Sequence, residues 1–144
     1  MRIKAIISYN GASYYGFQTQ NREDMNSIQD EIEKVLSKIF NRKIDIAASG
    51  RTDRGVHALG QVIHFDVDEE SVDLYKLRYS INCMLPKDIS FKEMKVVNDE
   101  FHSRFSAKSK TYRYIINTNE RNVILDKLVY NFSRKLDIDK IKEG

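Results

Sequence analysis

Hydrophobic and polar residues alternate at the start of the chain, where every second position from Ile3 to Tyr9 is apolar. A period of two is typical of a strand that buries one face. The same period recurs further along the chain, with Ile63 and Phe65 on one face and His64 on the other. Two shorter apolar segments indicate further strands. The four predicted strands cover residues 2–10, 44–48, 61–67 and 89–97.

Two segments between these strands show the 3.6-residue period of an amphipathic helix. The first helix ends at Asn41, and its apolar face consists of Ile28, Ile32, Val35, Leu36 and Ile39. Two residues can cap the start of this helix, each with a capping-box partner three positions later. The pairs are Asn26 with Gln29, or Ser27 with Asp30. The second helix follows Asp73 as its N-cap and ends before a turn at Pro86.

The order of these elements is strand, helix, strand, strand, helix, strand, which is the split βαβ pattern. We therefore expect an α+β fold over residues 1–98, with a ferredoxin-like (RRM-like) antiparallel sheet and two helices on one face. The remaining residues 99–144 show two more alternating segments, at 110–118 and 126–132, and a helix that begins at Ile138. We interpret this part as the first strands of a second, similar domain.

Composition excludes several classes of protein. With 41% hydrophobic and 31% charged residues among 144, the chain is too apolar to be disordered. No apolar segment is long enough to span a membrane. One cysteine cannot form an internal disulfide, so we expect a reducing, cytoplasmic location. The three histidines lack the spacing of a metal motif, and no nucleotide-binding loop is present, so we expect neither metal nor cofactor.

The segment Gly50–His57 places an acidic residue between two arginines in a glycine-bracketed connection. Glycines permit a sharp turn and the close approach of a ligand. Nearby guanidinium groups favour an ionised carboxylate, so Asp53 is a candidate nucleophile or base. The alternative is that Asp53 caps the turn or forms an ion pair with Arg51.

Basic residues form two clusters, although the net charge is only +3. Such clusters either solvate the surface or bind phosphates. Tyr112 and Tyr114 alternate on either side of a basic residue, a pattern typical of a base-stacking surface. The alternative is that both tyrosines line a core. The clusters are Arg51 with Arg54, and Arg104, Lys108, Lys110 and Arg113, and His57 is a further candidate for a phosphate contact.

The segment Gly50–Ala58 resembles the signature of the TruA-type tRNA pseudouridine synthases. Further segments resemble other motifs of that family in the same order, so the similarity runs from Arg2 to about Tyr130. These segments are Tyr9–Gly11, Tyr15–Gln20, Asn82, Leu85–Pro86, Asp88–Ile89, Phe101–Ala107 and Tyr112–Tyr114.

The resemblance implies an enzyme that isomerises uridine to pseudouridine in the anticodon stem-loop of tRNA, without a cofactor or metal. Asp53 matches the catalytic carboxylate, and the resemblance leaves open whether it attacks or deprotonates the nucleoside. Tyr112 matches the active-site tyrosine that stacks on the flipped-out base. Arg51 matches the arginine that enters the RNA helix. The implied phosphate contacts are Arg54, His57, Arg104, Lys108, Lys110 and Arg113.

Members of this family are substantially longer and form homodimers. We therefore expect a chain that is truncated within its second domain, weakly active or inactive, and open at the strand edges of 110–118 and 126–132. Two other classes of function stay open. One is a non-catalytic RNA-binding module, which does not need Asp53, and the other is a structural fragment that binds no RNA.

Overall fold

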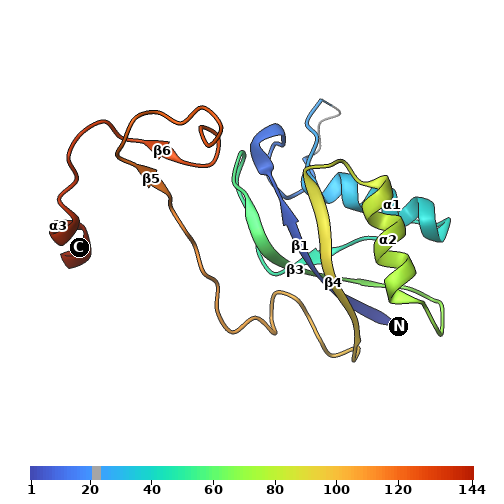
Figure 1. Ribbon diagram of the computed structural model, residues 1–144. Coiled ribbons are helices and arrows are strands. Elements are labelled where there is room, and N and C mark those ends of the chain that lie inside the picture. The colour runs from blue at the N-terminus through green and yellow to red at the C-terminus, as the bar shows by residue number, and fades with distance from the viewer. Residues whose placement is uncertain (21–23) are drawn as a thin grey trace. The chain divides into compact units, whose positions relative to one another are not determined.

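The computed structural model describes residues 1–20 and 24–144. The chain divides into two compact units, Met1–Lys108 and Ser109–Gly144 (Figure 1). The segment after Asn98 is held by long-range hydrogen bonds to the first unit. The domain boundary at 98/99 stays a prediction.

The first unit contains one four-stranded sheet in which every pair of neighbours is antiparallel. The strand order is β2-β3-β1-β4, and this order with these pairings is compatible with the ferredoxin-like topology. The α+β class and the antiparallel sheet are thereby confirmed. The strands are β1 (Arg2–Tyr9), β2 (Ala47–Ala48), β3 (Ala58–Asp66) and β4 (Ile89–Val97).

Two strands differ in length from the prediction. β2 covers only two residues of the expected 44–48, because only Ala47 and Ala48 pair with β3. β3 begins at Ala58 rather than at residue 61, because a register shift lets Ala58 pair with Tyr9 after Ile7 has paired with Gln61. Such an irregularity redirects side chains where a strand ends. Here it lies next to the segment Gly50–His57.

Two helices lie on the same side of the sheet, α1 (Ile28–Phe40) and α2 (Leu74–Met84) (Figure 1). α1 begins with the capping box that the sequence offered: Ser27 caps the helix and Asp30 binds back to it. Asn41 ends α1 in a left-handed conformation, with φ of 51°. Asp73 caps α2 as predicted, accepting a hydrogen bond from the Lys76 backbone.

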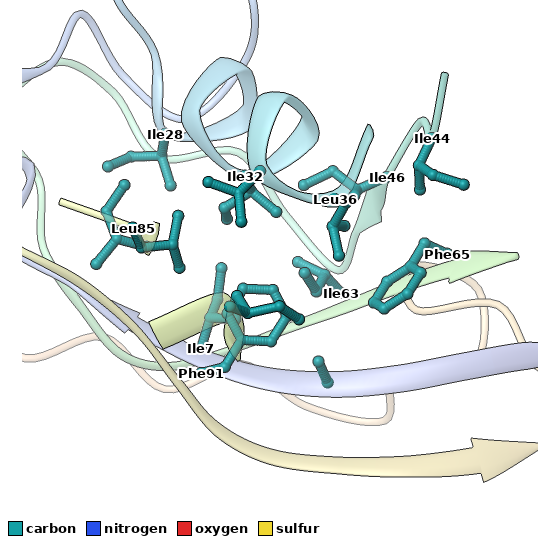
Figure 2. Packing of buried hydrophobic residues seen from close by; sticks show 14 of the residues in the cluster. Ile7, Ile28, Ile32, Leu36, Ile44, Ile46, Ile63, Phe65, Leu85 and Phe91 are labelled. Carbon is teal, nitrogen blue, oxygen red and sulfur yellow. The ribbon is translucent and has the colours of Figure 1, made fainter. Parts of the chain in front are cut away.

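The core lies between the sheet and α1, as the labelled side chains in Figure 2 show. Alternate residues of β1 are buried, which confirms the period of two in the sequence. The helix face is buried too, except that Ile39 is only partly covered. Fully burying one such side chain stabilises the fold by about 1.5–3 kcal/mol. The buried set includes Ile3, Ala5, Ile7, Ile28, Ile32, Leu36, Ile63, Phe65, Ile81 and Phe91.

The second unit corrects two predicted strands. In place of 110–118 and 126–132, the structure has the short strands β5 (Ile116–Asn117) and β6 (Tyr130–Asn131), which pair with each other in parallel. Alternation alone does not make a strand, because the backbone needs a hydrogen-bonded neighbour along its whole length. A short helix, α3 (Ile138–Glu143), follows Asp137 as predicted.

The two tyrosines of this unit are exposed. The exposed fractions are 70% for Tyr112 and 89% for Tyr114, so neither side chain lines a core in the described structure. Their base-stacking role stays a prediction. Separately, among the described residues, no helix is both long enough and apolar enough to cross a membrane.

Candidate active site

The segment Gly50–His57, which we call the acidic loop, connects β2 to β3. Both strands hold its start. The Ser49 backbone N–H donates to the Val62 carbonyl at 2.8 Å. The Gln61 side-chain amide donates to the Gly50 carbonyl. The loop therefore leaves the sheet from a point that the strand pairing determines.

Thr52 is held on two sides, by the last residue of β1 and by the segment that follows this strand. Its carbonyl accepts a hydrogen bond from the Phe17 backbone N–H at 3.0 Å. Its hydroxyl lies 2.7 Å from the hydroxyl of Tyr9. Burial raises the pKa of Tyr9, so this phenol stays protonated near neutral pH. Both the backbone and the side chain of the residue before Asp53 are thereby fixed.

His57 is held in the same way on the other side of Asp53. The Gly11 backbone N–H donates to Nδ1 of His57 at 3.0 Å. A neutral imidazole that accepts at Nδ1 carries its hydrogen on Nε2. The backbone of Gly11 lies close to that of Val56, since a Cβ on Gly11 would lie 2.0 Å from the Val56 carbonyl oxygen. Only glycine fits at this position without moving the loop.

Between these two anchors the chain makes a tight turn. The Val56 N–H donates to the Asp53 carbonyl at 3.1 Å. Gly55 has a φ of +78°, which suits the third position of a type II turn. Gly16 faces the turn from the neighbouring loop with a φ of +95°, and a Cβ there would lie 3.0 Å from the Thr52 carbonyl oxygen.

The Asp53 side chain is exposed at the start of this turn. Within residues 1–20 and 24–144, no hydrogen bond or ion pair engages its carboxylate. The alternatives that the sequence left open, a turn cap or an ion pair with Arg51, are therefore absent from the described structure. A carboxylate that is held in place by its neighbours and left unpartnered can act as a nucleophile or a base.

The two arginines beside Asp53 differ in their surroundings. Arg51 is exposed. Arg54 places its guanidinium over the ring of Tyr15, with 4.4 Å from Cζ to the ring centroid. Tyr15 belongs to the segment after β1, so a residue that the sequence analysis left without a role lies against the acidic loop.

The remaining predicted RNA contacts are divided between the two compact units. Arg104 and Lys108 are exposed in the first unit. Lys110, Tyr112 and Arg113 are exposed in the second. The place of Tyr112 beside Asp53 stays a prediction.

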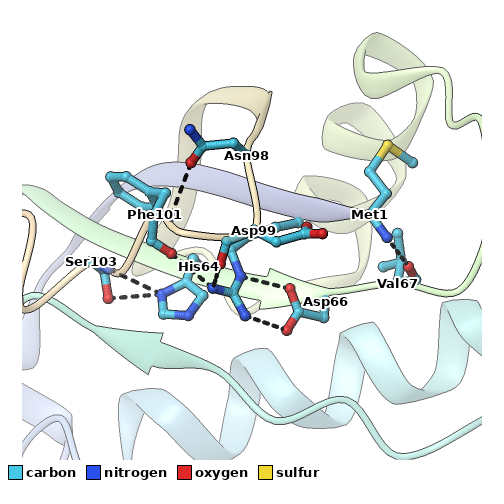
Figure 3. Close-up of polar contacts among 9 residues, drawn as sticks. Met1, His64, Asp66, Val67, Asn98, Asp99, Phe101 and Ser103 are labelled. Carbon is cyan, nitrogen blue, oxygen red and sulfur yellow. Dashed lines mark hydrogen bonds and ion pairs between the residues drawn. The ribbon is translucent and has the colours of Figure 1, made fainter.

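On the face of the sheet opposite the helices, the structure shows a buried polar cluster that was not predicted (Figure 3). Nδ1 of His64 lies 3.0 Å from the Ser103 hydroxyl and 3.2 Å from the Ser103 backbone nitrogen. The same hydroxyl donates to the Ala47 carbonyl in β2 at 2.9 Å. Arg2 donates to the Phe101 carbonyl at 2.9 Å. These bonds fasten the segment after β4 beside the strand that leads into the acidic loop.

His64 is structural in this cluster. Its exposed fraction is 6%. Burial, followed by the nearby charges of Arg2 and His102, lowers the pKa of its imidazole. The ring is therefore neutral near neutral pH. The sequence signal for this cluster is the polar face of β3, but the partners lie 39 residues away.

Comparison with known proteins places this arrangement in one family. A family model described as tRNA pseudouridine synthase matches residues 5–106, which include the whole acidic loop. A tRNA pseudouridine synthase A from Streptococcus uberis is 44% identical over 143 residues, covering 98% of this chain and 56% of the relative.

Two further relatives carry the same name. The protein from Bacillus licheniformis is 44% identical and covers 100% of this chain, with 58% of the relative aligned. The protein from Pseudoalteromonas translucida is 43% identical, with 100% of this chain and 54% of the relative aligned. This chain thus spans about half the length of the curated relatives it matches. On the match of the family model, the chain belongs to the tRNA pseudouridine synthase family.

Proposed function

We propose that this chain carries the uridine-isomerising site of a tRNA pseudouridine synthase, with Asp53 as the catalytic carboxylate. The observation that carries the proposal is the state of Asp53. Its carboxylate is exposed and unpartnered in the described structure, while Thr52 before it and His57 after it are both fixed. A preorganised reacting group of this kind needs little rearrangement when substrate binds.

The reaction exchanges one bond to the ribose for another. The bond from uracil N1 to C1′ breaks, a bond from C5 to C1′ forms, C5 loses its proton and N1 gains one. The carboxylate of Asp53 acts on the nucleoside as a nucleophile or as a base, and its exposed position serves either role. The uridine has to leave the base stack to reach it, which costs a few kcal/mol.

The finer assignments belong to the same proposal. The substrate is the anticodon stem-loop of tRNA, and the acting enzyme is a cytoplasmic homodimer. Tyr112 stacks on the flipped-out uracil, and Arg51 enters the RNA helix in place of the base. The phosphate contacts are Arg54, His57, Arg104, Lys108, Lys110 and Arg113. The positive charge of the arginines and lysines among them supports salt-dependent binding of RNA.

The test measures hydrogen released from C5. The purified chain is mixed in excess with an anticodon stem-loop RNA whose uridines carry tritium at C5, so that even one slow turnover is counted. We expect tritium release by the unchanged chain and none by Asp53→Asn. Asp24→Asn is the matched control, because Asp24 is also exposed and lacks a side-chain partner within the described residues.

Three outcomes separate the candidate functions. Tritium release that is lost only in Asp53→Asn supports catalysis by Asp53. Release that Asp53→Asn leaves unchanged refutes the assigned role. If the unchanged chain binds the RNA but releases no tritium, and forms no adduct with a 5-fluorouridine RNA, the chain is an RNA-binding module instead.

A further inference from the structure

Asp53 lies between two arginines in the sequence, yet neither forms an ion pair with it in the described structure. For Arg54 the reason is visible. Its guanidinium lies over the ring of Tyr15 at 4.4 Å. The attraction of a cation to an aromatic ring is of the same order as that of an exposed ion pair, so the ring competes with the carboxylate for this side chain.

Tyr15 can direct Arg54 because its own backbone is fixed. The Tyr15 N–H donates to the Asn26 carbonyl at 3.0 Å. The next residue, Gly16, accepts from the backbone N–H of Ile28 in the first turn of α1 at 3.3 Å. Phe17 then binds Thr52 in the acidic loop. The backbone around Tyr15 is therefore attached to both α1 and the acidic loop, and the residue is partly buried.

The contact with the ring leaves hydrogen-bond donors of the guanidinium available. Arginine has five N–H donors in its plane, and a cation–π contact does not use all of them. Within the described residues, no carboxylate or carbonyl accepts from the Arg54 side chain. A planar edge with free N–H groups matches the two oxygens of a phosphate.

We propose that Tyr15 is a positioning residue that holds Arg54 away from Asp53 and presents its guanidinium edge to a backbone phosphate of the bound RNA. This inference rests on the proposed function, because it assigns roles within the same site. Two consequences follow. The carboxylate stays unpaired, and a phosphate contact is fixed one residue away from it.

The test measures the affinity of the full chain for an anticodon stem-loop RNA at several salt concentrations. Arg54→Gln removes one phosphate contact, so we expect roughly tenfold weaker binding and a salt slope smaller by about one. Lys34→Gln is the control, because it removes the same charge from an exposed site on α1. We expect it to change neither quantity by as much as Arg54→Gln.

A double-mutant cycle tests the role of Tyr15. Tyr15→Phe keeps the ring and is expected to bind as the unchanged chain does, whereas Tyr15→Leu binds several-fold more weakly. Combined with Arg54→Gln, Tyr15→Leu is expected to add no further loss, since its effect acts through Arg54. Thermal unfolding checks that each variant folds, and Tyr15→Met replaces Tyr15→Leu if that variant does not fold.

Three results overturn the inference. The first is equal binding by Arg54→Gln and Lys34→Gln, and the second is no binding of RNA by the unchanged chain. The third is an additive loss in the double variant, which makes Tyr15 a merely structural residue. Neither measurement uses catalysis. Failure of this inference therefore leaves the outcome for Asp53 to the tritium assay.

Discussion

Replacing Gly11 by alanine tests whether the contact between the segment after β1 and the acidic loop sets the position of Asp53. The new Cβ would lie 2.0 Å from the Val56 carbonyl oxygen and 2.9 Å from the carbonyl carbon. Gly11 does not have a positive φ, so alanine is conformationally allowed and the effect is steric. Relief of the clash requires the backbone at Val56 to move by about 1.5 Å, because an ordinary contact begins near 3.4 Å.

Overpacking of this kind costs about 1–3 kcal/mol of unfolding free energy. For a unit of this size that lowers the thermal midpoint by roughly 5–20 °C. A shift of about 1 Å in a catalytic group also reduces turnover by about 100-fold. Denaturant and thermal unfolding measure the first effect, and tritium release measures the second.

Gly60→Ala is the matched control, because its Cβ would lie 3.7 Å from the Ile6 side chain, an ordinary contact. We expect this variant to be neutral or slightly stabilising. Neutral surface substitutions usually change the free energy of unfolding by no more than about 0.5 kcal/mol. If the free energies of unfolding of Gly11→Ala and Gly60→Ala differ by less than that, the contact with Gly11 does not hold the loop.

Two further predictions concern the stability of the first unit. Ser27→Ala removes the capping hydroxyl of α1 and is expected to lower the free energy of unfolding by about 1 kcal/mol. Ser80→Ala, at an exposed position of α2, is the control and is expected to leave that free energy unchanged. Equal urea midpoints for the two variants contradict the prediction. The lowered pKa of His64 makes its stabilising contribution complete above about pH 6.5 and progressively lost below it, because the unfolded chain then binds the proton more readily. Urea titrations at pH 7.5 and pH 5.5 are expected to show this loss, and a loss of equal size in His64→Gln refutes the assignment to His64.

The elements that could be predicted from the sequence are those whose signals are local. The period of two defined β1, and the pairing of Ser27 with Asp30 defined the start of α1. The order of strands and helices then predicted the sheet, because few topologies connect such elements without crossing. The prediction failed in the second unit. There the residues around Tyr112 alternate in character, but no neighbouring strand in the described part of the chain pairs with that segment along its length.

What the sequence by itself determined is the family, the α+β sheet of the first unit and the loop that carries Asp53. The tertiary structure decided how that loop is held and what its charged residues contact. Tyr9 meets Thr52 across 43 positions of the chain, and Gly11 meets His57 across 46. No local pattern encodes such distant pairs. For the same reason, only the fold could show that the guanidinium of Arg54 lies over the ring of Tyr15 instead of pairing with the carboxylate beside it in the sequence.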